Sequence, residues 1–179
     1  MSHQDIKKTV ENALLELKPR SFNNAMFNMA NVYNQISETS LEMIRKSKNA
    51  DFAGPAIMCK SFSIELMLKF FISFAEHAEK YDDINNKEDL KGHKYTDLFD
   101  KIPENYKTII AKYFSEISGK TMTIENFRKS LIDVGNTPFV KWRYIYEQKN
   151  INHMDINLLA TIANALGLAG MELLKEEDS

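Results

Sequence analysis

The stretch FVKWRYIYE, from Phe139 to Glu147, gathers side chains able to do chemistry: the only tryptophan of the chain, two tyrosines, an arginine and a glutamate. Basic residues beside aromatic rings suit single-stranded RNA, because they contact phosphate while bases stack on rings such as that of Tyr146. On a helix, however, Phe139, Trp142 and Ile145 share one face, which predicts packing against a bundle. Both interpretations stay open at this point.

A second polar set lies within the apolar stretch AIMCKSFSIELMLKFFISFAEHAEK. Its polar residues Ser61, Glu65, Lys69 and Ser73 recur every four positions, so they form one narrow row on a helix that is apolar on nearly every other side. Charges seldom lie inside a bundle unless they are paired. The row therefore predicts a polar partner on a neighbouring element.

These two polar sets suggest one compensated cluster between two helices. We expect Arg143 to pair with Glu65 and Glu147 to pair with Lys69, with Tyr146 in the same region. By itself, the spacing of Arg143 and Glu147 makes only a helix pair that contributes roughly a few tenths of a kcal/mol. The cluster is either a structural ion-pair network or a ligand site, since both kinds of arrangement shift the pKa values of charged groups.

His93, in the sequence GHKY, is the histidine with the most suggestive position, at the start of an expected helix. It either caps or packs the loop, or it contacts phosphate or takes part in catalysis. No pair of potential metal ligands has a recognisable spacing, because EHAE at Glu76 to Glu79 lacks the second histidine of a zinc helix. No cofactor is expected, since a Gly-rich phosphate loop is absent from the sequence.

Composition limits the classes of protein to consider. The 179 residues are enough for one domain, and only six glycines and four prolines favour helices. The 23 basic and 25 acidic residues nearly cancel, which excludes non-specific binding of nucleic acid or lipid by a global charge. Cys59, the only cysteine, indicates a reducing compartment and a buried thiol. With no leader and no apolar span of about eighteen residues, we expect a cytoplasmic protein without a membrane segment.

Apolar periodicity and end signals predict the elements. Residues 1–20 form an arm with a short amphipathic helix over Ile6–Leu17, and residues 21–179 form a single domain. A long helix follows Ser21, and the apolar helix after it starts at Asp51 or Gly54. The remaining elements are a solvated loop or poorly ordered excursion over 80–91, a short helix ending before Pro103, a helix over 104–118 ending near Gly119, a helix over 124–134 capped by Thr121 or Thr123, and a last helix capped by Asp155.

The predicted fold class is an all-α antiparallel up-down helical bundle. The order IELMLKFFI, a charged loop, GHKYTDLFDKIP, another helix, FVKWRYIYE and a closing helix resembles bacterial HEPN-domain proteins over Phe22–Leu174. That resemblance implies an up-down bundle, often a homodimer, in bacterial defence, stress, toxin–antitoxin or nucleotidyltransferase-associated systems. It also implies RNA or a nucleotide as ligand, and an antitoxin or nucleotidyltransferase as partner protein.

Many HEPN proteins are metal-independent ribonucleases, with an arginine followed after four to six residues by a histidine. In this chain nine residues separate Arg143 from His153. On one helix, ten positions turn the histidine roughly 80° away from the arginine and move it about 15 Å along the axis. We therefore expect a non-catalytic or divergent HEPN-like module that binds a partner protein or nucleic acid. The alternative is an endoribonuclease that uses Arg143 with His93 or another histidine brought in by the tertiary structure or a second subunit.

Overall fold

The computed structural model describes residues 22–77, 83–84, 87–143 and 154–177, and within them every regular element is a helix. The predicted all-α class is therefore confirmed for this part of the chain. The predicted arm over 1–20 lies outside it. The elements are α2 (Phe22–Ser47), η1 (Ala50–Phe52), α3 (Ala53–Ala75), η3 (Lys87–Leu90), α4 (Tyr95–Asp100), α5 (Glu104–Ser118), α6 (Ile124–Asp133), α7 (Pro138–Arg143) and α8 (Ile156–Glu177).

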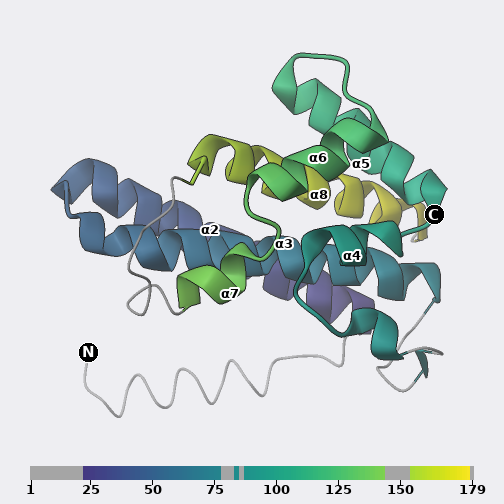
Figure 1. The fold of residues 1–179 in the computed structure, drawn as a ribbon. Coiled ribbons are helices and arrows are strands. Elements are labelled where there is room, and N and C mark those ends of the chain that lie inside the picture. The colour runs from purple at the N-terminus through teal and green to yellow at the C-terminus, as the bar shows by residue number, and fades with distance from the viewer. Residues whose placement is uncertain (1–21, 78–82, 85–86, 144–153, 178–179) are drawn as a thin grey trace, which may run out of the picture.

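The helices pack around α3, as Figure 1 shows. The two long helices α2 and α3 run antiparallel along each other, as predicted, and α8 lies along α3 as well as against α5. The short helices α4 and α7 pack on α3, while α6 lies over α4 and α5. This arrangement makes α3 the central helix of the bundle.

The core follows from the nearly all-round apolar character of α3. Ile64, Leu68, Phe70 and Phe71 of this helix have no exposed surface. The α8 backbone approaches the core through Gly170, where a Cβ atom would lie only 2.6 Å from Cε2 of Phe27. The other large, fully buried side chains in the described part of the chain are Tyr95, Lys60, Phe99, Phe127, Met67, Leu98, Ile102 and Ile110.

Several predicted helix ends are confirmed in atomic detail. Thr123 caps α6 through a capping box, in which its side chain accepts from the backbone N–H of Asn126 and the Asn126 side chain accepts in return. Asp155 Oδ1 accepts from the backbone N–H of Leu158 at 2.9 Å at the start of α8. Gly119 ends α5 in the left-handed conformation, with φ of 65°, which suits a residue without a Cβ atom.

Two predictions about the connections are wrong. Neither Asp51 nor Gly54 caps α3, because the chain enters that helix through η1, whose own cap is the Asn49 side chain. The loop predicted over 80–91 is not wholly solvated, since η3 is helical and Ile84 and Leu90 are 3% and 8% exposed. These two apolar side chains anchor the described part of the connection to the core.

Two further predictions need correction. The polar residues buried on α3 are not confined to one row, because Lys60 and Ser63 are each 1% exposed. By length and composition α8 could cross a membrane, although no such stretch was expected. The same length and composition also occur in the core helix of a bundle, and Leu159, Ile162 and Leu166 of α8 are buried in this core.

Candidate functional site

The polar row of α3 contains a buried carboxylate that is bonded to a half-exposed histidine. Glu65 is 1% exposed, and its two oxygens lie 2.9 and 3.0 Å from Nδ1 of His93. Lys69 Nζ donates to Glu65 Oε1 at 2.7 Å, one helical turn further along α3. Because a carboxylate only accepts hydrogen bonds, His93 donates from Nδ1. Glu65 therefore lies between two donors, and the His93 side chain remains 53% exposed.

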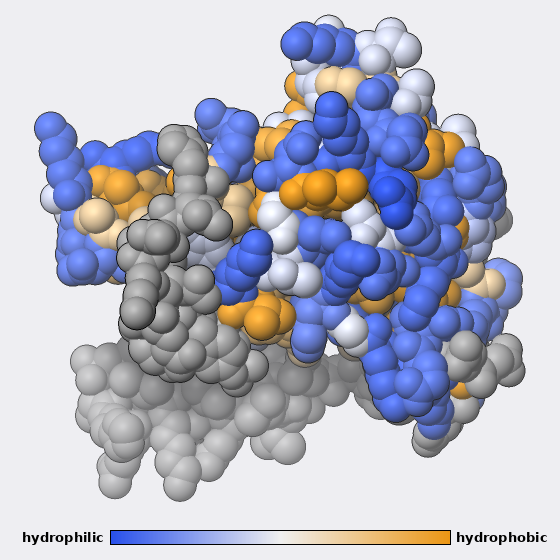
Figure 2. Space-filling view, viewed as in Figure 1, coloured by the Kyte–Doolittle hydropathy of each residue, from blue (hydrophilic) through white to orange (hydrophobic). Residues whose placement is uncertain are grey.

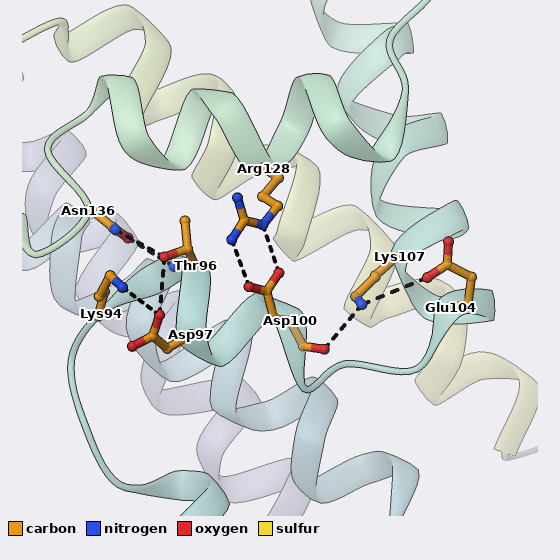
Figure 3. Close-up of polar contacts among 8 residues, drawn as sticks. All are labelled: Lys94, Thr96, Asp97, Asp100, Glu104, Lys107, Arg128 and Asn136. Carbon is orange, nitrogen blue, oxygen red and sulfur yellow. Dashed lines mark hydrogen bonds and ion pairs between the residues drawn. The ribbon is translucent and has the colours of Figure 1, made fainter.

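His93 precedes α4, and the start of this helix is held by the loop between α6 and α7. The backbone N–H of Tyr95 donates to the carbonyl of Asn136 at 2.8 Å, and that of Thr96 donates to Asn136 Oδ1 at 2.9 Å. Asn136 Nδ2 donates back to Thr96 Oγ1 at 3.0 Å (Figure 3). Asn136 has a φ of 58°, a conformation that asparagine tolerates better than most residues. Asn136 thus satisfies the first N–H groups of α4 from another segment.

This geometry excludes a capping role for His93. The residue at the N-cap of α4 is Lys94, and it makes no side-chain capping bond. Since Asn136 satisfies the helix start, the His93 ring is directed to Glu65 instead. The other roles considered for His93 stay open: packing of the loop, contact with phosphate and a part in catalysis are all compatible with its half-exposed ring.

A buried tyrosine lies close to Glu65. Tyr95 has no exposed surface, and its hydroxyl donates to the carbonyl of Ser61 at 2.5 Å. Burial raises the pKa of Tyr95 well above its usual value, and the negative charge of Glu65 adds to this shift. The phenol therefore stays neutral and acts as a fixed donor. Ser61 Oγ is the one buried side-chain oxygen or nitrogen without a hydrogen-bond partner in the described part of the chain.

Aromatic rings border the histidine on the side of α7. Phe139 stacks on Phe62 with ring centroids 4.6 Å apart, and Phe62 meets Tyr33 edge-on at 4.7 Å. The His93 ring lies 6.3 Å from the ring of Phe139. Trp142 is partly buried against the core. The packing interpretation of FVKWRYIYE therefore holds for Phe139 and Trp142.

The other candidates in that stretch are only partly described. Arg143 is the last residue of α7, one helical turn beyond Phe139, and its side chain lies outside the described part. Tyr146, Glu147 and His153 lie wholly outside it. The predicted contacts of Arg143 with Glu65 and of Glu147 with Lys69 therefore stay predictions.

The structure brings together Glu65, Lys69 and His93, which the sequence suggested for separate reasons. Glu65 and Lys69 pair with each other, as neighbours four residues apart on a helix can, although the sequence predicted a partner for each of them on another helix. The link to His93 spans 28 residues of chain, and nothing in the local pattern signals it. The polar row of α3 does not face one common partner, because Ser73 Oγ donates to Asn23 Oδ1 of α2 at 2.5 Å whereas Glu65 bonds His93.

The surroundings of His93 are hydrophilic but nearly balanced in charge. Lys94 Nζ donates to Asp97 Oδ1 at 2.7 Å, and Lys91 pairs with Glu88. Figure 2 shows a hydrophilic surface over α4 and η3. The described residues contain no group of three or more histidine, cysteine or acidic side chains able to hold a metal ion. The chemistry on offer is hydrogen bonding or proton transfer at Nε2 of His93, with Nδ1 fixed by Glu65.

Comparisons with known proteins do not assign this site. The chain matches no family model, no curated protein and no solved structure. The geometry around His93 is therefore the basis of the function proposed below.

Proposed function

We propose that the chain is a HEPN-like binding module of a bacterial defence, stress or toxin–antitoxin system, and that it contacts single-stranded RNA at His93. The observation that carries this proposal is the half-exposed His93 ring bonded to the buried Glu65 carboxylate. A histidine that served only packing would gain little from a buried charge at one nitrogen and solvent at the other. The same pairing fixes the ring of a histidine that must meet a ligand.

Chemistry near His93 favours a nucleic acid over other anions. The imidazole offers a hydrogen bond to a phosphate oxygen, and the flexible ammonium group of Lys94 lies in the neighbouring residue with its side chain 53% exposed. The ring of Phe139, which is partly exposed in α7, lies beside His93 and offers a face for base stacking. Because the whole chain carries a net charge of only −2, binding depends on these local groups and should be weak and sensitive to salt.

Fluorescence anisotropy with a labelled single-stranded RNA tests this function. We expect His93→Ala to weaken binding by about tenfold, the loss that corresponds to about 1.4 kcal/mol. The matched control is His77→Ala, since His77 is an exposed histidine beyond the end of α3. Equal affinity of the wild type and both variants would contradict the proposal.

Metal-independent RNA cleavage is the second candidate, and it has an observation of its own. A buried carboxylate at Nδ1 orients a histidine for proton transfer at Nε2, and Arg143 lies one helical turn beyond Phe139, whose ring is 6.3 Å from that of His93. The purified protein would then cleave RNA in EDTA, and either Arg143→Ala or His93→Ala would abolish cleavage without loss of helical signal. Binding ranks first because Glu65 is already neutralised by Lys69, and the nine-residue gap departs from the HEPN ribonuclease pattern.

The assembly implied by the resemblance belongs to the same proposal. We expect a homodimer in the cytoplasm, with an antitoxin or nucleotidyltransferase as a further partner. Light scattering coupled to gel filtration measures the mass directly. A species of one chain at micromolar concentration would remove the dimer from the proposal without affecting RNA binding at His93.

A further inference from the structure

The outer side of α2 carries an apolar stripe that the described helices leave open. Met29, Val32 and Ile36 are 51%, 51% and 45% exposed, and their spacing of three and four residues places them on one face. Met26, Phe27 and Ala30 of the same helix are buried in the core. A surface helix usually turns polar residues outward. The stripe therefore marks a second packing face on α2.

The stripe continues into a groove at the start of α2. This groove has a volume of about 370 Å³ and lies between α2, α3 and η3. Its apolar lining includes Phe22, Met26 and Met29 of α2 together with Leu66 and Leu90. Among the described residues, its polar lining consists of the three lysines Lys69, Lys87 and Lys91. The groove thus fits an apolar helix face bordered by acidic side chains.

We propose that the segment Ile6–Leu17 of the same chain forms a helix that packs antiparallel on this stripe and covers the groove. Only residues 18–21 separate Leu17 from Phe22, which itself lines the groove. Connections of about two to five residues are typical between two antiparallel helices. A tether of this length also gives the segment an effective concentration that a separate molecule seldom reaches.

The spacing of apolar residues supports this register. Counted outward from the connection, Leu17, Leu14, Val10 and Ile6 occupy the same steps as Phe22, Ala25, Met29 and Tyr33. Each residue of the first set therefore lies opposite its counterpart when the chain folds back on itself. Three of those counterparts line the groove: Phe22, Ala25 and Met29. A partner from outside the chain would have no reason to match the apolar spacing of α2 counted from this connection.

Charge complements the apolar match. On a helix, Glu11 and Glu16 lie on opposite edges of the stripe formed by all four apolar residues of this segment, each about 110° from its centre. Whichever edge faces η3, a glutamate borders the lysines of the groove. Lys69 also bonds Glu65, so the cover lies next to the candidate site. This inference does not depend on the proposed binding of RNA.

Crosslinking in the full-length chain tests the cover. Val10→Cys and Met29→Cys are introduced together and treated with a short bismaleimide, and the product is mapped by gel electrophoresis and mass spectrometry. We expect an intramolecular 10–29 link in most of the protein. Leu14→Cys with Ala25→Cys serves as an independent pair, and circular dichroism confirms that each variant folds.

The controls separate the other occupants of the stripe. Val10→Cys with Ile132→Cys should give no internal link, because Ile132 is 50% exposed on α6, a helix that packs on α4, α5 and α8. Val10→Cys alone shows any link to Cys59, which is buried. Intermolecular links at twice the mass would assign the stripe to a second copy and overturn the proposal. Internal links no more abundant than in the control pair, for both test pairs, would overturn it as well.

Discussion

Lys60 and Glu65 are charged residues of the same helix, each 1% exposed, yet their surroundings differ. Lys60 Nζ donates to Asn34 Oδ1 at 2.6 Å and to Glu38, so its partners belong to the long helix α2. Glu65 bonds Lys69 on its own helix and His93 from the loop before α4. Five positions on a helix separate the two side chains by about 140°, so they point to different neighbours.

The two clusters therefore have different expected roles: the Lys60 cluster stabilises the fold, and the Glu65 cluster is available to a ligand. The Lys60 cluster joins two helices along their length, which ties it to the stability of the α2–α3 pair. The Glu65 cluster ends in a ring that is 53% exposed, so part of it is available to a ligand. Changes on the Lys60 side should therefore alter unfolding, whereas changes at His93 should alter binding.

The largest effect on stability is expected for Glu38→Ala. This change leaves the buried ammonium group of Lys60 with only the Asn34 amide, which should lower the free energy of unfolding by about 2–4 kcal/mol, near the usual cost of stranding a buried charge. Urea denaturation measures the loss. The double variant Lys60→Met with Glu38→Ala should recover most of it, since no charge then remains buried. A double variant as unstable as the single one would break the comparison.

A smaller loss is expected where α8 closes over the same side of α3. Gly170→Ala places a methyl group 2.6 Å from Phe27 and 3.2 Å from Phe70, and overpacking of this kind costs about 1–3 kcal/mol. Gly167→Ala is the matched control, because its nearest neighbour is Asn31 Oδ1 at 3.9 Å, and the change should be neutral or slightly stabilising. Thermal unfolding of both variants tests this expectation. An equal melting temperature for the two would contradict the close approach of the α8 backbone to Phe27.

His93→Ala should show the opposite pattern. Glu65 keeps its bond to Lys69, so the free energy of unfolding should fall by no more than about 1 kcal/mol, the scale of one hydrogen bond. RNA affinity should fall while the urea midpoint hardly moves. A loss of stability as large as that of Glu38→Ala would assign the Glu65 cluster to structure and would remove the contrast.

The smallest effect concerns a pair that is not buried and lies at the end of α4 away from His93. The hydrogen bond from Arg128 to Asp100, drawn in Figure 3, is the main cause of a lowered pKa at Asp100. A depressed carboxylate pKa stabilises the fold above the unfolded value, and the gain disappears as the pH falls through the folded value. Asp100→Asn should therefore flatten the loss of stability in acid. Salt should reduce this difference, because the side chains of both partners are about one third to one half exposed.

Much of the fold could be predicted from local signals. The long apolar run predicted the central helix, and Thr123, Asp155 and Gly119 marked helix ends because capping depends on residues within one turn. The entry to α3 was missed because Asn49 caps a short 3₁₀ turn ahead of the helix. The cap of a 3₁₀ turn and the cap of an α-helix use the same residue types, so the sequence alone does not distinguish them.

The candidate site was only partly predictable. Glu65 and Lys69 stood out as charges in an apolar helix, and their pairing follows from helix geometry. Lys60 did not stand out in the sequence, because its burial depends on Asn34 and Glu38 of another helix. The role of His93 depends on Asn136, which occupies the start of α4 from 40 residues away. Contacts of that range are set by packing and leave no periodic trace in the sequence.

The central claim is that His93 meets a ligand, and the most direct test follows its ring by NMR. A titration with single-stranded RNA would record the Cε1–H signals of the histidines, assigned by comparison with His93→Ala and His77→Ala. We predict a saturable shift of the His93 signal while that of the exposed His77 stays in place. A His93 signal that does not move, or one that moves no more than that of His77, would contradict the account.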